Sequence, residues 1–214
     1  MDLFDPSFLV RVAVRELDLA VTPGALLDGL LAAEGPSLLE STAADERLGR
    51  YGIFACMPLE VLVLRDGVLT DSRGRRLAEG RDAWRSLEAA FACVRAERPA
   101  GAAYAPGWIG YVGYEVGRLV ERLPGRAARD TVLPDLRLAF HDAVLVHDAL
   151  AGTWTLSELV FDGPRPDGAG RAAERLLAIA AEARTDGDRP GGSVAGDAGT
   201  ISTTGARQIG RAHV

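Results

Sequence analysis

Cysteine and histidine, the side chains that most often build metal and redox sites, are scarce in this sequence. The 214 residues include two cysteines and three histidines. No cysteine pair has the CxxC spacing of zinc ribbons or thioredoxin-like proteins, so neither class is indicated. Cys56 and Cys93 each lie in an apolar stretch. We expect buried free thiols in a reducing cytosol, and a single bridge between the two remains the alternative.

Long hydrophobic runs and an excess of positive charge are also absent. No apolar run approaches the ~20 residues that span a bilayer. The N-terminus MDLFDPSF lacks the basic flank and apolar core of a signal peptide. The net charge of −6 and the pI of about 5.2 argue against nucleic acid as the main partner. These absences predict a soluble cytoplasmic protein.

Signatures of catalytic and phosphate-binding sites are missing as well. The sequence has no GxSxG, GxxxxGKS/T or HExxH motif. Two His-Asp pairs, at His141 and His147, invite a metal-site interpretation, but six residues of strand span roughly 20 Å at about 3.3 Å each. The two histidines therefore cannot share one ion, and we interpret them as strand-end or surface residues. We predict no metal ligand and no catalytic residue in this chain.

The patterns that are present indicate strands and helices. Alternating apolar residues predict a strand over 8–15, and Thr22-Pro23 predicts the start of a helix that ends at Gly35-Pro36. Further strands are expected at 37–42, 48–57, 59–64, 68–71, 136–140, 143–147 and 153–160. Because the strands come in runs and not in βαβ alternation, we predict an α+β fold of mostly antiparallel, sandwich-like β-sheet with flanking helices.

Two later segments are expected to be helical, and turns are expected between neighbouring strands. Asp82 can cap the second helix, whose buried face is predicted from the spacing of Trp84, Leu87, Phe91 and Val94. The third helix is expected over 171–184. Turns are predicted at Asp66-Gly67 and at 149–152.

The composition changes after Arg184. Residues 185–208 contain six glycines and only two large aliphatic side chains, which is typical of a disordered linker. The domain is therefore expected over 1–184. Residues 209–214 match the hexapeptide that one reading frame of a widely used sequencing adapter encodes before a stop codon. We expect this segment to be an adapter scar, and a natural C-terminus is the alternative.

Glycines recur with aromatic residues between positions 107 and 117. The spacing is GxxGxxGxxxG, which is not the GxGxxG of a phosphate loop. Glycine permits close approach of another backbone or unusual dihedral angles. We expect this segment, with Trp108, Tyr111 and Tyr114, to form a packing surface against another sheet or domain.

Residues 37–42 place polar groups at the end of a short apolar segment. Glu40 could pair with an ammonium group of a small amphipathic ligand, and Ser41 could add one hydrogen bond beside the wall formed by Leu39. The alternative is that both polar residues lie on an edge strand and are satisfied by the backbone. The residues alone leave both interpretations open.

Several motifs together resemble one enzyme family. The segment Leu38-Leu39-Glu40-Ser41, then Arg50-Tyr51 and Pro58, resembles the "LLES … RYS … P" pattern of component I of anthranilate synthase and aminodeoxychorismate synthase. Residues 107–115 and 121–124 resemble its "GGxxGYLGYD … fExLP" segment. Residues 133–135 and 142–148 resemble its "lPd … yDxvlvfDh" stretch. The resemblance runs from about Leu26 to Leu159, and Gly52 departs from it where serine is usual.

The resemblance implies the N-terminal domain of a chorismate-utilising aminase, cut off before the catalytic domain. The full-length enzyme would add ammonia from a glutamine amidotransferase partner to chorismate, with Mg²⁺ held in the missing C-terminal domain. We favour 4-amino-4-deoxychorismate synthase, on the route to para-aminobenzoate and folate, because Trp108 and Trp154 are reminiscent of that branch. Anthranilate synthase, on the route to tryptophan, is the first alternative. A stand-alone tryptophan-binding or assembly module without catalysis is the second.

The resemblance also implies a ligand for residues 39–41. In this family, the glutamate and serine of the "LLES" segment help to form a tryptophan pocket, so Leu39, Glu40 and Ser41 are the candidate contacts. The other wall of that pocket would belong to the C-terminal domain. This fragment alone is therefore expected to bind tryptophan weakly or not at all, and to be inactive.

Overall fold

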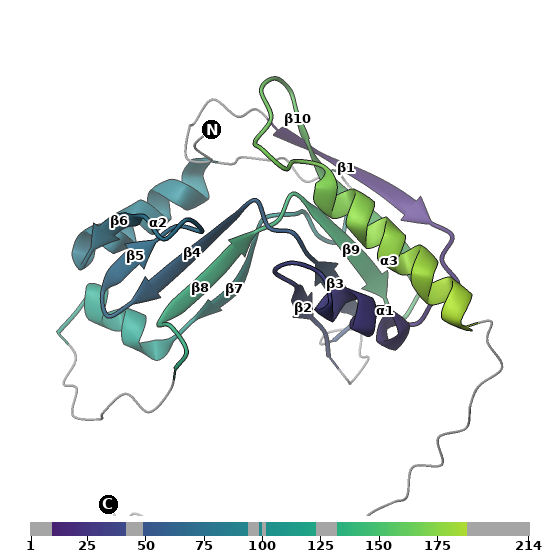
Figure 1. Cartoon of the computed structure of the whole chain (residues 1–214), viewed down its shortest axis with the longest axis horizontal. Coiled ribbons are helices and arrows are strands. Elements are labelled where there is room, and N and C mark those ends of the chain that lie inside the picture. The colour runs from purple at the N-terminus through teal and green to yellow at the C-terminus, as the bar shows by residue number, and fades with distance from the viewer. Residues whose placement is uncertain (1–9, 42–48, 94–98, 100–101, 123–131, 188–214) are drawn as a thin grey trace, which may run out of the picture.

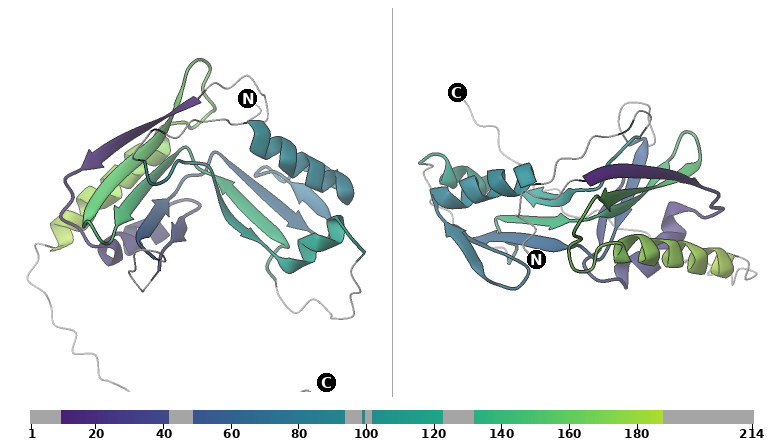
Figure 2. Two further views of the ribbon diagram at one scale, coloured as in Figure 1. Left: turned by 180° about the vertical axis from the view of Figure 1, so that it is seen from behind. Right: turned by 90° about the horizontal axis from the view of Figure 1, so that it is seen from above.

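The protein is built from two antiparallel five-stranded sheets with helices on their outer sides (Figure 1, Figure 2). The computed structural model describes residues 10–41, 49–93, 99, 102–122 and 132–187. This arrangement confirms the predicted α+β class. Residues 188–214, which hold most of the predicted linker and all of the predicted adapter scar, lie outside the described residues. Both assignments remain predictions.

The first sheet has the strand order β1-β10-β9-β3-β2. It consists of β1 (Val10–Leu17), β2 (Ser37–Leu39), β3 (Tyr51–Ala55), β9 (Ala143–Asp148) and β10 (Thr153–Phe161). Two helices, α1 (Pro23–Leu31) and α3 (Arg171–Gly187), cover one of its faces. The helix α3 ends three residues later than the sequence predicted. The β9–β10 hairpin confirms the predicted turn at 149–152.

The second sheet has the strand order β6-β5-β4-β8-β7. It consists of β4 (Glu60–Arg65), β5 (Val68–Thr70), β6 (Arg76–Glu79), β7 (Trp108–Val112) and β8 (Leu136–Phe140). The helix α2 (Arg81–Cys93) and the 3-10 helix η1 (Tyr114–Leu119) pack on this sheet. The predicted turn at Asp66-Gly67 is confirmed, with φ angles of 50° and 78°.

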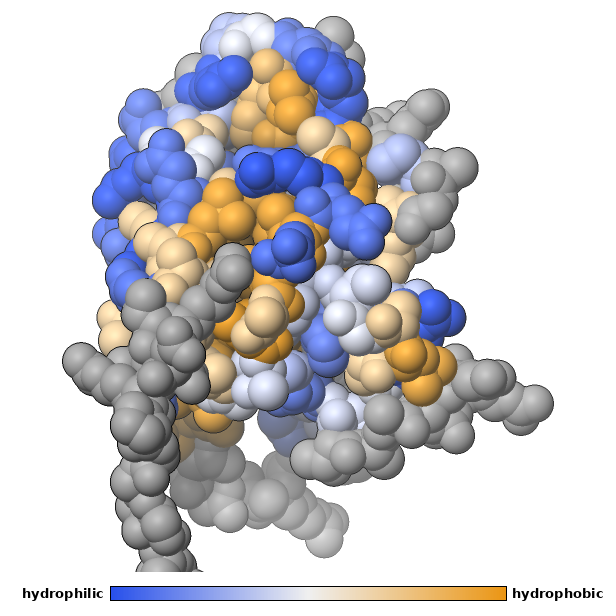
Figure 3. All heavy atoms as spheres, turned by 90° about the vertical axis from the view of Figure 1, so that its right-hand side faces the viewer, coloured by the Kyte–Doolittle hydropathy of each residue, from blue (hydrophilic) through white to orange (hydrophobic). Residues whose placement is uncertain are grey.

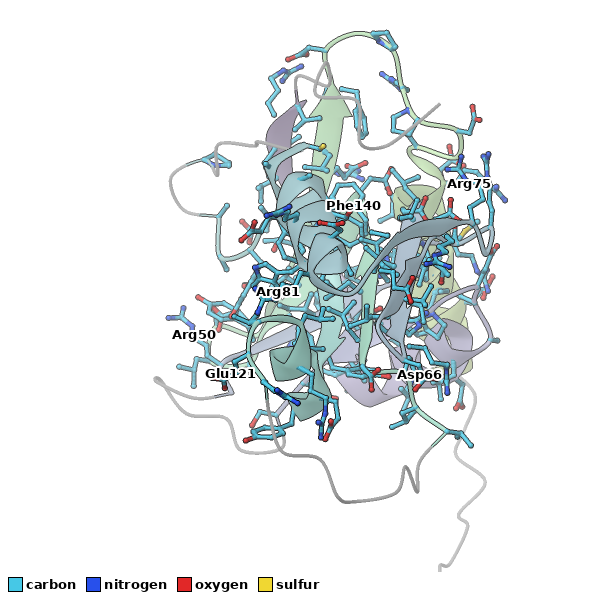
Figure 4. All side chains as sticks on the ribbon, turned by 90° about the vertical axis from the view of Figure 1, so that its left-hand side faces the viewer. Arg50, Asp66, Arg75, Arg81, Glu121 and Phe140 are labelled. Carbon is cyan, nitrogen blue, oxygen red and sulfur yellow. The ribbon has the colours of Figure 1, made fainter. Side chains whose placement is uncertain are left out.

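The chain passes between the sheets at two places. Residues 56–59 connect β3 to β4, and His141-Asp142 connects β8 to β9. All of the second sheet is therefore nested within the chain between the strands of the first sheet. The sheets diverge from this junction (Figure 1). Phe140 lies in the interior, whereas Arg50 and Arg75 lie at the periphery (Figure 4).

Each sheet has its own hydrophobic core. The core of the first sheet joins Phe54, Leu145, Trp154 and Leu156 to residues of α1 and α3. In the second sheet, Leu62, Leu64 and Leu138 pack against α2 and η1. A smaller cluster, which includes Ile53, Val144 and Val146, contacts Ile109 of β7 and so joins the two sheets. Apolar patches broken by hydrophilic side chains cover the side of the molecule formed by the first sheet and its helices (Figure 3).

The buried face of α2 differs from the prediction. Ala83, Leu87 and Ala90 are buried, whereas 38% of Trp84 and 48% of Phe91 is exposed. Three and four residues separate the buried positions, so the predicted periodicity is correct and its phase is wrong. The small side chains of Ala83 and Ala90 pack in the core of the second sheet. Val94 lies outside the described residues.

Both cysteines are free, as the sequence predicted. Cys56 is buried and Cys93 is partly exposed. Burial raises the pKa of the Cys56 thiol to about 11, so it is protonated and unreactive at neutral pH. None of the helices in the described ranges is long and apolar enough to cross a membrane.

Candidate ligand-binding segment at the end of strand β2

The three candidate contacts Leu39, Glu40 and Ser41 lie where the first sheet ends at its β2 edge. Leu39 is the last residue of β2 and pairs with Ile53 of β3. Its side chain is 46% exposed, and Glu40 and Ser41 follow it as exposed residues. Three consecutive exposed residues, an apolar one, a carboxylate and a hydroxyl, therefore lie at an accessible edge of the sheet. Residues 42–48, which follow, lie outside the described residues.

His147 of β9 is an electrostatic neighbour of Glu40. Burial lowers the pKa of His147, and the charges of Asp148 and Glu40 partly oppose that shift. The imidazole packs on the indole of Trp154 with 4.5 Å between ring centroids. Trp154 is in turn fixed by a 3.2 Å hydrogen bond from its Nε1 to the carbonyl of Val21. His147 is half-buried in an aromatic cluster, which agrees with its interpretation as a strand-end residue.

An ion pair fixes the chain on the other side of the candidate segment. Arg50 donates from Nε and Nη2 to the carboxylate of Asp148, at 3.1 and 2.7 Å. Hydrogen bonds from Arg50 are the main reason that the pKa of Asp148 falls to about 2. The guanidinium lies 4.9 Å from the ring centroid of Tyr51, and Tyr51 meets Tyr104 edge-to-face at 5.5 Å. The Arg50-Tyr51 motif of the sequence thus anchors β3 to the β9–β10 turn.

Gly52, at the position where the sequence departs from its resemblance, adjoins this aromatic cluster. A Cβ atom there would lie 3.1 Å from the ring of Phe54 and 3.8 Å from Cβ of His147. Glycine therefore leaves room that the ring of Phe54 uses.

The other predicted features of the site lie elsewhere. His141 is fully buried at the junction between the sheets, and so is not a surface residue. Among the described residues, no group of three potential metal ligands is close enough to hold an ion. A small pocket at the start of α3 is separate from residues 39–41. Its lining residues are Glu34, Met57, Pro58, Leu59, Asp167, Gly168 and Arg171.

One pairing was missed by the sequence analysis. Nε2 of His141 lies 3.0 Å from Oγ of Ser37, and its Nδ1 lies 3.2 Å from the carbonyl oxygen of Cys56. Burial lowers the pKa of His141 to about 4, so the imidazole is too weak a base to activate the serine near neutral pH. The partners are 104 and 85 residues apart, and no local signal in the sequence could have revealed them.

The glycine segment confirms close backbone approach at two positions. A Cβ atom at Gly110 would lie 1.9 Å from the carbonyl oxygen of Arg137, and one at Gly113 would lie 2.7 Å from that of Asp135. The expected packing surface against another sheet is confirmed at Trp108, which packs in a cluster with Val12 and Phe161 of the first sheet. Tyr111 and Tyr114 are not part of that cluster. Trp108 and Tyr111 are three residues apart on a strand, so they point to opposite faces.

The aromatic side chains of this segment have separate surroundings. The indole of Trp108 packs against Phe140, with 5.1 Å between ring centroids, and also contacts Phe91. Tyr111 donates from its hydroxyl to the carbonyl of Pro134. Tyr114 is 85% exposed. Trp108 therefore packs in the core of this chain, and Tyr114 lies on the surface.

Comparison with known proteins finds relatives named anthranilate synthase component 1 and 2-amino-4-deoxychorismate synthase. The chain is 33% identical over 162 residues to anthranilate synthase component 1 of Thermus thermophilus, which covers 75% of this chain and 33% of that protein. It is 34% identical over 155 residues to anthranilate synthase component 1 of Cereibacter sphaeroides, covering 68% of this chain and 29% of that protein. No family model matches the sequence.

A third relative carries the other enzyme name. The chain is 32% identical over 169 residues to 2-amino-4-deoxychorismate synthase of Streptomyces globisporus, covering 67% of this chain and 34% of that protein. A crystal structure of anthranilate synthase component I from Streptococcus pneumoniae aligns with a TM-score of 0.44 and 15% identity, over 83% of this chain and 38% of that chain. The chain thus belongs to the family of anthranilate synthase component 1 and 2-amino-4-deoxychorismate synthase. It spans about a third of the length of these curated relatives.

Proposed function

We propose that this chain is the N-terminal scaffold and regulatory part of the large subunit of a chorismate aminase. The complete enzyme would add ammonia to chorismate, and a glutamine amidotransferase partner would release that ammonia. The sequence identity of 32–34% to relatives bearing both enzyme names is the observation that carries this proposal. Mg²⁺ and the catalytic groups would belong to the part of the enzyme that this chain does not include.

The direct test is amination by the product of the complete reading frame. Incubation with chorismate, Mg²⁺ and an ammonium salt should give an aminated product. The 214-residue chain alone should give none under the same conditions. Turnover by the short chain above a blank would contradict the assignment of catalysis to the remainder.

Within the family, we favour aminodeoxychorismate synthase. That enzyme would place nitrogen at C4 of chorismate and keep the enolpyruvyl group, whereas anthranilate synthase would place it at C2 and expel pyruvate. Trp108 and Trp154 both pack in cores of this chain, so the preference still rests on sequence resemblance. Measuring pyruvate release alongside amination separates the two reactions. Stoichiometric pyruvate would favour anthranilate synthase.

We also propose that Leu39, Glu40 and Ser41 contribute to a tryptophan site. Support comes from the exposed carboxylate and hydroxyl that follow Leu39 at the end of β2, whose partner strand β3 begins directly after Arg50 of the Arg50–Asp148 ion pair. The carboxylate would receive the ammonium group of the amino acid. Glu40→Gln should weaken tryptophan binding by the complete enzyme about tenfold or more, the range for loss of a charged hydrogen bond.

A matched control tests whether that loss is local. Glu16 is an exposed glutamate on β1, at the opposite edge of the same sheet. Glu16→Gln removes the same charge and should leave tryptophan binding unchanged. Equal losses in both variants, measured by isothermal titration calorimetry, would argue against Glu40 as a contact.

A stand-alone tryptophan-binding or assembly module is the second candidate. The exposed position of residues 39–41 is compatible with it. The nucleotide sequence decides between the two, because an enzyme requires the frame to continue past codon 208 into a chorismate-binding domain. A natural stop directly after Gln208 would support the module.

A further inference from the structure

The junction between the two sheets is held together by hydrogen bonds between its two crossings. Leu59, at the end of the first crossing, donates its N–H to the carbonyl of Phe140 at 2.8 Å. His141, in the second crossing, lies against the carbonyl of Cys56 in the first. The two places where the chain changes sheet therefore contact each other directly.

His141 extends this junction to an edge strand of each sheet. Its ring nitrogen Nε2 contacts Oγ of Ser37, the first residue of β2. Its backbone N–H donates to the carbonyl of Gly107 at 2.9 Å, directly before β7 begins. The strands β2 and β7 are the outermost strands of their sheets. One fully buried residue thus contacts the first residue of β2 and the residue directly before β7.

The hydrogen-bond partners fix the roles of the two ring nitrogens. A backbone carbonyl can only accept, so Nδ1 must carry the proton that it donates to Cys56. Nε2 is then the acceptor in the neutral ring, and the hydroxyl of Ser37 donates to it. Through this bond the side chain of Ser37 reaches the junction.

β2 depends on few other contacts. It has three residues and pairs with β3 alone. Ser37 precedes Glu40 by three residues, so the bond to His141 fixes the origin of the candidate ligand segment. The strand β7 is similarly limited to one neighbour, β8.

We propose that His141 is a positioning residue that fixes β2 to the start of β7, so that a ligand held at Glu40 and Ser41 also stabilises the edge of the second sheet. The ligand part of this inference rests on the proposed tryptophan site. The mechanical part requires no ligand and is tested separately. The expected coupling has a physical path, because each edge is hydrogen-bonded to the same buried residue.

Hydrogen exchange with mass spectrometry tests the mechanical part in the 214-residue chain. Ser37→Ala should accelerate exchange in the peptide covering 107–112 by about two- to tenfold, the range expected for one net hydrogen bond. His141→Asn, which retains a donor for Cys56 but withdraws from Ser37, should accelerate the same peptide. The double variant should add little to either single change.

Two further variants separate positioning from a general loss of stability. Ser157→Ala also removes a buried hydroxyl from the first sheet, but that hydroxyl has no hydrogen-bond partner and belongs to β10. It should leave exchange at 107–112 unchanged. Ser37→Thr keeps a hydroxyl and should restore the original rate. Unchanged exchange at 107–112 in Ser37→Ala, or equal acceleration in Ser157→Ala, would overturn the proposal.

L-Tryptophan tests the ligand part in the product of the complete reading frame. L-Tryptophan should slow hydrogen exchange in both peptides, 37–41 and 107–112. In Ser37→Ala, it should still slow exchange in 37–41 but no longer in 107–112. Protection confined to 37–41 in the unmodified protein would overturn the coupling. Protection of neither peptide would reject the tryptophan site itself, while the ligand-free comparison would still decide the role of His141.

Discussion

The first sheet is covered by two α-helices that pack closely together, whereas the second is covered by one α-helix and a short 3-10 helix. A Cβ atom at Gly29 of α1 would lie 2.8 Å from Ile179 of α3, which shows how near those helices approach. On the second sheet, 48% of Phe91 and 85% of Tyr114 is exposed. The helix-facing core of the first sheet is therefore covered by this chain's own helices. On the second sheet, the exposed parts of Phe91 and Tyr114 are a surface on which the rest of the proposed enzyme would pack.

The largest difference in the free energy of unfolding is expected between variants of two tryptophans, one packed on each sheet. Trp154 is 1% exposed in the core of the first sheet, and Trp84 is 38% exposed on α2. Trp154→Ala should lower the free energy of unfolding by about 3–5 kcal/mol. Trp84→Ala should cost less than about 1 kcal/mol. Urea denaturation measures both, and equal losses would contradict the difference in coverage.

Acid should weaken the junction that both sheets share. His141 has a pKa of about 4 in the folded chain, below its ordinary value of 6.5. The unfolded chain therefore binds a proton first, and stability present above pH 6.5 is lost as the pH falls towards 4. The expected slope is up to about 1.4 kcal/mol per pH unit.

Variants of the two histidines test which group causes this pH dependence of stability. In urea denaturation between pH 4.5 and 7.5, His141→Gln should flatten the dependence, and His147→Gln should retain most of it. A slope that is unchanged in His141→Gln would show that another group is responsible.

Substitutions of two glycines test how closely β7 packs against β8 in the second sheet. Gly110→Ala places a methyl group against the backbone of Arg137, which cannot move without displacing β8, and should cost about 2–3 kcal/mol. Gly107→Ala meets nothing within 4 Å and should be nearly neutral. Thermal unfolding followed by circular dichroism compares them. A neutral Gly110→Ala would mean that β7 is loosely attached.

The smallest effect is expected at the periphery of the first sheet. Arg50→Ala removes a partly exposed ion pair and should cost about 1 kcal/mol at pH 7, because solvent screens such pairs. Asp148 has a depressed pKa of about 2, so its contribution is present above pH 3.8 and disappears as the pH falls through 2. The difference between the variant and the original chain should therefore shrink at low pH in urea titrations. A difference that grows would contradict the ion-pair assignment.

Local sequence patterns predicted where helices, strands and turns lie better than they predicted which strands pair. Both hairpin turns were correct because Asp66-Gly67 and residues 149–152 carry their own turn chemistry. β6 was missed because two of its four residues, Arg76 and Glu79, are charged, and its pairing with β5 leaves no mark in that segment. The pairing of Val10 with Phe161 is equally invisible locally, since it depends on residues at opposite ends of the domain.

The candidate site was predictable only in part. The sequence placed Leu39, Glu40 and Ser41 together because they are adjacent, and the structure leaves all three accessible. It could not show that His147 and Asp148 lie across the sheet from them, because register is a tertiary property. The burial of His141 was missed for the same reason, since its partners Ser37 and Cys56 are distant in the sequence.

The nesting of the second sheet inside the first has a consequence for biogenesis. Every strand of the second sheet is complete at Phe140, whereas β1 must wait for β10, which ends at Phe161. As the chain leaves the ribosome, β4 and β8 can meet while the earliest strand still has no neighbour. Vectorial synthesis thus favours an order in which the second sheet folds first. Its folding then brings β3 and β9 close together, so that the first sheet can close around them.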